Sequence, residues 1–190
     1  MQEGGLRREP IYRAMAKRTP KEFAEYLAFG KAWEWRVYEF LRTRYCDLRP
    51  PKTLEQAQGC VDEESDLALS GFPIECKRRR FDFTNAADYP YATFYIDEEY
   101  KLRDRTIPKD KYFAMPMADR RSYLKPFMFY ATANRDMTHM GVVIPASKPY
   151  WTLERRTLHS DQRQGDSWAC QLNKVLFCPV EDWQTILTRV

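Results

Sequence analysis

Residues 65–77 decide the fold and read SDLALSGFPIECK. Two short apolar segments flank Ser70-Gly71, a pattern that predicts a β-hairpin with a two-residue turn. Such a turn places Asp66 directly opposite Glu75. Opposed residues project to the same face of a hairpin, and alternate residues along one strand do the same. The sequence therefore predicts that two carboxylates and the ammonium group of Lys77 share one face.

This grouping of charges indicates a divalent-metal site. Two adjacent carboxylates repel each other unless a cation or a shared proton lies between them. Mg²⁺ prefers oxygen ligands, which Asp66, Glu75 and the backbone carbonyl of Cys76 could supply, while the Cys76 side chain points to the other face. A bound ion of this kind activates water and stabilises charge on a phosphate under attack. Lys77 could orient that water, or accept its proton if the pKa of Lys77 is depressed.

A long helix is predicted upstream of the hairpin. Residues 19–22, Thr-Pro-Lys-Glu, supply an N-cap, a proline suited to the first turn and the glutamate of a capping box. Apolar residues then recur at helical spacing, which predicts one helix from about residue 20 to residue 45. Gly30 marks either a close packing contact or a break into two helices. Glu34 borders the buried stripe and is predicted to reach the hairpin as a further metal ligand; an exposed surface glutamate is the alternative.

The pattern Asp66-x8-Glu75-x-Lys77 resembles the signature of the PD-(D/E)XK nuclease superfamily, which includes restriction enzymes, Holliday-junction resolvases and phage exonucleases. Residues 30–41, GKAWEWRVYEFL, fit the helix pattern G-x-x-x-E-x-x-V-x-x-x-L found in many members. The resemblance covers roughly residues 20–80 and implies an α/β fold with a central mixed β-sheet flanked by helices, as in restriction endonucleases. It also implies that Asp66 and Glu75 are metal ligands, that Lys77 is catalytic and that Glu34 is a further ligand. Ser65 stands where the signature has proline.

The rest of the chain predicts a sheet-rich body. Residues 1–18 form a polar N-terminal segment, and residues 19–190 form a single domain. A terminal helix is expected at Glu181–Leu187. Further strands are expected at Thr93–Ile96, Tyr112–Met115, Phe127–Thr132, Gly141–Ile144, Trp168–Leu172 and Val175–Cys178.

Composition excludes several classes of protein. The 190 residues carry a net charge of +4, and no window approaches the roughly 18 consecutive apolar residues of a membrane span. No signal peptide is apparent at the N-terminus. The five cysteines are scattered without C-x-x-C pairs, which argues against a disulfide framework and against a zinc or iron–sulfur site. Scattered thiols favour a reducing cytoplasm, and the resemblance implies a bacterial or phage-infected cell.

Basic residues next to the hairpin predict contacts with a nucleic acid. Arg78, Arg79 and Arg80 directly follow Lys77 and are expected to hold backbone phosphates. A second basic stretch spans residues 101–125. Charged runs of this kind are alternatively only solvated surface. Aromatic residues between 89 and 113 could stack on bases, although burial in the core is the more usual role.

The resulting hypothesis is a nuclease that hydrolyses DNA, with RNA not excluded and an endonuclease favoured over an exonuclease. Its catalytic residues are Asp66, Glu75 and Lys77, and its metal ligands are Glu34, Asp66, Glu75 and Cys76, binding one or two Mg²⁺ or Mn²⁺ ions. A homodimer is left open. The alternatives are a catalytically inactive nucleic-acid-binding protein with the same fold, or an interaction protein whose hairpin charges form ion pairs. One residue of 62–64 could also replace Asp66 as a ligand.

Overall fold

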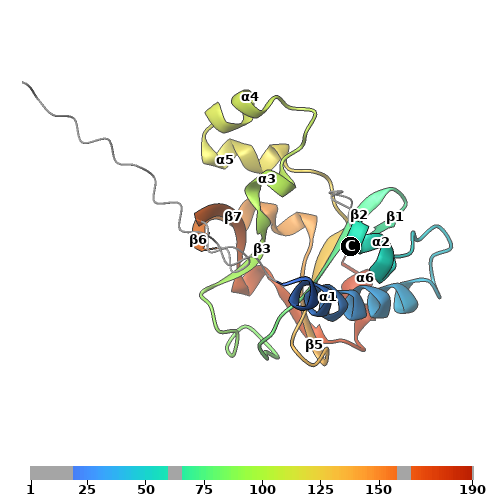
Figure 1. Ribbon diagram of the computed structural model, residues 1–190. Helices are drawn as coiled ribbons and strands as arrows, with labels where there is room; N and C mark the ends of the chain where they lie inside the picture. Colours follow the sequence, from blue (N-terminus) through green and yellow to red (C-terminus); the bar gives the residue numbers. More distant parts are fainter. Residues whose placement is uncertain (1–18, 60–65, 158–163, 190) are drawn as a thin grey trace, which may run out of the picture.

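The computed structural model describes residues 19–59, 66–157 and 164–189 of the chain (Figure 1). The polar segment 1–18 lies outside the described residues, as do the acidic residues 62–64 that could replace Asp66.

α1 spans Pro20–Leu41 and begins as predicted. The Thr19 side chain accepts a hydrogen bond from the backbone N–H of Glu22, whose carboxylate accepts one from the backbone N–H of Thr19. The helix ends at Leu41, before the predicted residue 45: residues 42–44 form a turn that brings Tyr45 against the first hydrophobic cluster. Gly30 neither breaks the helix nor makes a close contact. A Cβ placed there would meet no described atom beyond the helix within 4 Å, so both predictions for Gly30 are wrong.

The central sheet contains the hairpin and has five strands in the order β1-β2-β4-β5-β8. Their bounds are Leu67–Leu69, Phe72–Arg78, Phe129–Ala133, His139–Val143 and Leu176–Pro179. β2 runs parallel to β4, whereas the other neighbours are antiparallel, so the prediction of a mixed central sheet is confirmed. The hairpin register is also the predicted one. Leu67 pairs with Ile74 because Ser70 and Gly71, with φ values of 49° and 79°, form a two-residue turn.

A second sheet, antiparallel and three-stranded, is not anticipated by the sequence. It contains β3 (Thr93–Glu98), β7 (Gln164–Gln171) and β6 (Trp151–Thr157) in that order. Strands are present where residues 93–96 and 168–172 predicted them, but they belong to this sheet and both are longer than predicted, with β7 ending at Gln171. β6 is missed because Trp151 and Leu153 are its only apolar residues.

The strand predicted at Tyr112–Met115 is wrong. These residues belong to α4 (Lys109–Ala114) and to its C-cap, Met115. Prolines bound the helix on both sides: Pro108 precedes it, and Pro116 keeps Met115 extended at φ −71° and ψ 148°. The helix buries Tyr112 completely, whereas the adjacent Phe113 is 37% exposed, so only one of the two aromatic residues that suggested a strand belongs to the core.

Two hydrophobic clusters cover opposite faces of the central sheet. The first joins α1 and α6 (Trp183–Leu187) to the sheet and includes Trp33, Val37, Ile74, Phe129 and Trp183. The second joins the two sheets and includes Phe94, Tyr130, Val143, Trp151 and Trp168. The layers are therefore helix, central sheet and second sheet. Gly141 permits close packing of the two sheets, since a Cβ there would lie 2.6 Å from the ring of Phe94.

The remaining helical segments are short. They are α2 (Leu54–Gly59), α3 (Glu99–Leu102), α5 (Met117–Arg120) and the 3₁₀ turns η1 (Arg121–Tyr123), η2 (Pro145–Tyr150) and η3 (Leu172–Lys174). α3, α4 and α5 are grouped beside β3, at the top of Figure 1. No helix in the described part of the chain has the length and apolar character needed to cross a membrane.

Candidate functional site

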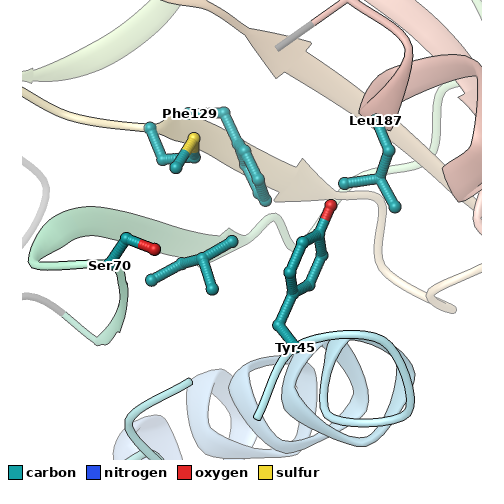
Figure 2. A pocket seen from close by; sticks show the side chains of 6 residues that line it. Tyr45, Ser70, Phe129 and Leu187 are labelled. Carbon is teal, nitrogen blue, oxygen red and sulfur yellow. The ribbon is translucent and has the colours of Figure 1, made fainter. Parts of the chain in front are cut away.

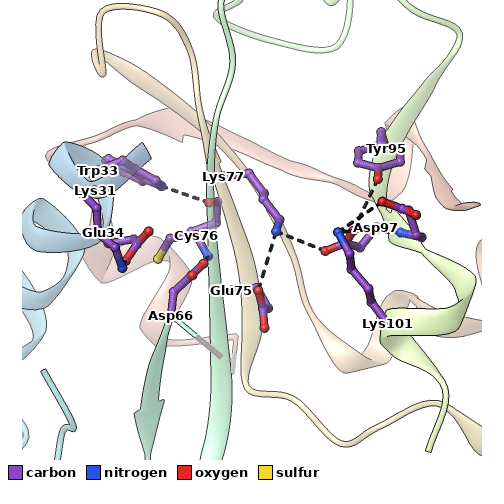
Figure 3. A network of polar contacts seen from close by, with 12 residues as sticks. Lys31, Trp33, Glu34, Asp66, Glu75, Cys76, Lys77, Tyr95, Asp97 and Lys101 are labelled. Carbon is purple, nitrogen blue, oxygen red and sulfur yellow. Dashed lines mark hydrogen bonds and ion pairs between the residues drawn. The ribbon is translucent and has the colours of Figure 1, made fainter. Parts of the chain in front are cut away.

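β2 presents different side chains to its two neighbouring layers (Figure 3). Ile74 and Cys76 are buried on the face toward α1, within the first hydrophobic cluster. Glu75 and Lys77 point to the opposite face, where the Lys77 Nζ lies 3.8 Å from the Glu75 Oε2. This alternation is the predicted one.

Asp66 lies just before β1, at the edge of β2. Its Oδ2 accepts a hydrogen bond from the backbone N–H of Cys76 at 2.7 Å. The N–H and C=O of one residue point to the same edge of a strand, so the Cys76 carbonyl faces this edge as well. The Asp66 carboxylate therefore lies at the edge of β2, between the face of Glu75 and the face of α1. Burial raises the pKa of Asp66, while Lys77 and the hydrogen bond from Cys76 act in the opposite direction.

Glu34 reaches the same edge from α1. The neighbouring Trp33 donates a hydrogen bond from Nε1 to the Ala131 carbonyl at 3.0 Å, and Ala131 pairs with Cys76 in the sheet. This bond aligns α1 with β2, so Glu34 is 6% exposed and turned toward the sheet rather than the solvent. Its carboxylate forms an ion pair with Lys31. Burial, followed by the charge of Asp66, raises the pKa of Glu34 to about 7.

Glu34, Asp66 and Glu75 together form what we call the carboxylate cluster. The pKa of Glu75 rises to about 8, again through burial first and the charge of Asp66 second. Because the charge of Asp66 raises the pKa of both glutamates, both lie within electrostatic reach of Asp66. Glu34 and Glu75 lie on different sides of β2, however. Within residues 19–59, 66–157 and 164–189, no group of three or more His, Cys, Asp or Glu side chains is arranged to hold a metal ion.

A second group of charges surrounds Lys77, and we call Lys77, Asp97 and Lys101 the lysine–aspartate cluster. The Lys77 Nζ lies 3.1 Å from the Asp97 Oδ2, and the Lys101 Nζ lies 3.6 Å from the Asp97 Oδ1. Burial alone would lower the pKa of Lys77, but Asp97, Glu75 and Asp66 raise it well above the usual value. Lys77 therefore stays charged. The expectation that it could accept a proton through a depressed pKa is wrong.

Sequence reasoning missed Asp97. The strand was predicted to end at Ile96, whereas β3 continues through Asp97 to Glu98. One available signal was the acidic run of residues 97–99, which directly follows an apolar strand. All three acidic side chains of this run are buried, at 3–8% exposure.

The three arginines after Lys77 have different environments. Arg78 donates to the carbonyls of Arg135 and Phe29, and its guanidinium lies 3.9 Å from the centre of the Phe29 ring. Arg79 donates to the Tyr95 carbonyl at 3.0 Å. Arg80 is exposed. Two of the residues expected to hold phosphates thus bind backbone carbonyls, and Arg80 is the most accessible of the three.

The second basic stretch also approaches the site. A β-bridge between Arg103 and Leu124, together with a hydrogen bond from the Lys125 N–H to the Leu102 carbonyl, joins its two ends. Burial and then the charge of Arg105 lower the pKa of Lys125, whereas Glu75 raises it. Lys125 therefore lies within electrostatic reach of Glu75, and Arg105 lies within reach of Lys125.

A pocket of about 240 Å³ lies at the turn end of the hairpin, away from these charges (Figure 2). It is lined by Tyr45, Leu69, Ser70, Met128, Phe129 and Leu187. The lining contains no carboxylate, lysine or arginine, so the pocket has none of the groups that the predicted chemistry requires.

Comparison of the chain with protein-family models, curated proteins and solved structures found no match.

Proposed function

We propose that this protein is a metal-dependent nuclease of the PD-(D/E)XK type that hydrolyses phosphodiester bonds in DNA. One observation supports this most: Glu34 from α1, Asp66 just before β1 and Glu75 from β2 surround Cys76, with Glu34 and Glu75 on different sides of β2 and Lys77 beside Glu75. Burial, and then the charge of Asp66, raises the pKa values of Glu34 and Glu75, so these carboxyl groups hold protons that a divalent cation could displace.

The donor chemistry fits Mg²⁺ or Mn²⁺. Carboxylate oxygens of Glu34, Asp66 and Glu75 and the carbonyl of Cys76 are the hard ligands that these ions prefer, and they would hold one or two of them. A bound ion would lower the pKa of a coordinated water and neutralise charge on the scissile phosphate.

The basic residues would bind and orient the substrate. Lys77 is a charged donor fixed beside Glu75, so it can hold a phosphate oxygen or orient the attacking water without accepting its proton. Arg80, Arg105 and Lys125 would contact flanking phosphates, which would make binding weaken as salt increases.

The proposed setting is a reducing cytoplasm in a bacterium or a phage-infected cell. Cys46, Cys76, Cys170 and Cys178, the cysteines within the described residues, are free thiols. Free thiols are usual in such a compartment.

A catalytically inactive nucleic-acid-binding protein is the second candidate. It is favoured by the ion pair between Lys77 and Asp97 and by the separation of Glu34 and Glu75 across β2. In this alternative the charges near Lys77 stabilise the fold, and the basic residues bind DNA without cleaving it.

A cleavage assay separates the two candidates. Linear, circular, single-stranded and branched DNA, and RNA, are incubated with the protein in Mg²⁺, in Mn²⁺ and in EDTA. We expect metal-dependent cutting of DNA, including circular DNA as an endonuclease requires, and its loss in Lys77→Ala. Lys174→Ala serves as the control, because Lys174 lies over the Tyr150 ring, outside both charged clusters. DNA binding that persists in EDTA, without cutting in either metal, would establish the inactive binding protein instead.

A further inference from the structure

We propose that Asp97 is a positioning residue that holds Lys77 in place for the cleavage reaction. This inference rests on the proposed nuclease function and adds a residue from the second sheet to its site. Asp97 is 5% exposed and belongs to β3, whereas Lys77 belongs to the central sheet. The Lys77 Nζ is closer to Asp97, at 3.1 Å, than to its strand neighbour Glu75, at 3.8 Å.

The local structure of β3 aims Asp97 at Lys77. The pairing of β3 with β7 shifts register between Tyr95 and Asp97, so the strand contains a bulge at this point. A bulge inserts one residue and turns the following side chain to a new direction. The Asp97 carboxylate therefore faces the central sheet across the interface between the two layers (Figure 3).

Separate contacts fix the two oxygens of Asp97. Its Oδ1 accepts hydrogen bonds from the Glu98 N–H at 2.8 Å and from the Tyr95 hydroxyl at 3.3 Å, and it lies 3.6 Å from the Lys101 Nζ. Its Oδ2 faces Lys77. Because Oδ1 anchors the carboxylate, Oδ2 is a fixed acceptor for an ammonium group carried on a long and flexible chain.

Fixing that chain matters for the reaction. The lysine side chain has many accessible rotamers, and the side chain of Lys77 remains 31% exposed, so it could otherwise move toward solvent. A catalytic group held in position before the substrate binds loses less freedom in the transition state. Asp97 would therefore act through Lys77, without touching the substrate.

Glu98 provides a matched control for this role. It is buried on the same strand, next to Asp97, and its Oε1 lies 3.2 Å from the same Lys101 Nζ. This ion pair joins Glu98 to Lys101. Asp97→Asn and Glu98→Gln each remove one buried negative charge from β3, but only Asp97→Asn breaks an ion pair with Lys77.

The test compares steady-state cleavage by the wild-type protein, Asp97→Asn, Asp97→Glu and Glu98→Gln, below the Tm of each. We expect Asp97→Asn to lower kcat about 10- to 100-fold with less than about a threefold change in KM, since a mispositioned catalytic group costs rate rather than binding. Asp97→Glu should recover part of the rate, because it restores the charge. Glu98→Gln should cleave like wild type even if its Tm falls.

If the wild-type protein cleaves DNA and Asp97→Asn and Glu98→Gln cleave it at equal rates, the positioning role is overturned while the nuclease proposal remains intact. A loss of cleavage rate that is equal in both variants and parallels the fall in their Tm values would also overturn it, because such a loss would show a structural role only. If the wild-type protein cuts no substrate in Mg²⁺ or Mn²⁺, the nuclease function itself is overturned, and the positioning role with it.

Discussion

The carboxylate cluster and the lysine–aspartate cluster lie beside the same strand, yet they hold their buried acids in opposite ways. Glu34 and Glu75 have pKa values raised to about 7 and about 8, because burial and the charge of Asp66 outweigh the nearby cations. Burial alone would also raise the pKa of Asp97, but Lys77 and Lys101 lower it. The carboxyl groups of the first cluster have too few cations to stay ionised and retain protons, whereas the second cluster already contains its cations. An added cation should therefore act on the first cluster and leave the second unchanged.

The largest expected effect comes from removing the charge of Asp66, which acts on both glutamates of the carboxylate cluster. Asp66→Asn should lower the cleavage rate by about 10²- to 10³-fold or more, the loss expected when one electrostatic group of an active site is removed. Asparagine can still accept the hydrogen bond from the Cys76 N–H, so the hairpin should remain folded. Single-turnover cleavage and circular dichroism measure the two properties. Asp182→Asn is the control, since the Asp182 carboxylate accepts a hydrogen bond from the Thr185 hydroxyl at the start of α6, outside the site. Wild-type cleavage by Asp66→Asn would remove Asp66 from the mechanism.

The second prediction concerns thermal stability in the presence of metal. A ligand that binds only the folded state at 100 times its Kd adds about 2.7 kcal/mol, which for a domain of this size raises Tm by about 5–10 °C. Mg²⁺ or Mn²⁺ should produce such a rise in wild type and a much smaller one in Asp66→Asn. Differential scanning fluorimetry at matched ionic strength measures it. Asp97→Asn should retain the rise, because Asp97 already has its cations. The same shift in both variants would place the metal elsewhere.

The contrast between the two clusters also shows what the sequence could predict. The turn at Ser70-Gly71 sets the register of the hairpin, and Thr19 sets the start of α1, so the positions of Glu75 and Glu34 could be predicted from signals only a few residues long. The prediction that Asp66 shares the face of Glu75 is wrong, because its carboxylate lies at the edge of β2, where it accepts a hydrogen bond from the Cys76 N–H. The second cluster depends on the packing of one sheet against another. Nothing near residue 77 indicates that Asp97 will face it, because that contact follows from the order of distant strands and from a bulge in β3.

The third prediction is the pH dependence of stability without metal. Glu34 and Glu75 have folded-state pKa values above the usual value of 4.5, so between pH 4.5 and about 8 the folded protein binds more protons than the unfolded chain. Their contribution is fully present below pH 4.5 and is lost as the pH rises through about 7 and 8. In EDTA, Tm should therefore fall by several degrees between pH 5 and pH 8, and Glu34→Gln should flatten the fall near pH 7. The lowered pKa of Asp97 acts in the opposite direction, and only below its ordinary value of 3.8. A Tm that is constant or rises over this range would contradict the raised pKa values of Glu34 and Glu75.

The fourth prediction compares two arginines. One of them, Arg78, already has partners within the protein, whereas Arg80 is accessible to a ligand. Arg78 binds the carbonyls of Arg135 and Phe29, so Arg78→Ala should lower Tm. Arg80 is exposed, so Arg80→Ala should leave Tm unchanged, weaken DNA binding several-fold and reduce the slope of log K against log salt by about 0.9. Fluorescence anisotropy at several salt concentrations, in EDTA to prevent cleavage, measures the slope. An unchanged slope in Arg80→Ala would mean that DNA does not contact this residue.

The smallest expected effect compares the packing of the helix layer with that of the second sheet. Gly30 lies on α1, one turn before Glu34, where a methyl group would meet no other described part of the molecule within 4 Å, whereas Gly141 faces the ring of Phe94 at 2.6 Å. Gly30→Ala should therefore stabilise the helix by up to about 1 kcal/mol and raise Tm by about 2–4 °C. Gly141→Ala should destabilise the protein by about 1–3 kcal/mol through overpacking. Cleavage should be unchanged in Gly30→Ala, because the fold does not need the empty space beside this glycine. A variant that is more stable but no longer cuts DNA would show instead that the substrate occupies that space, and so would locate the path of DNA along α1 toward the carboxylate cluster.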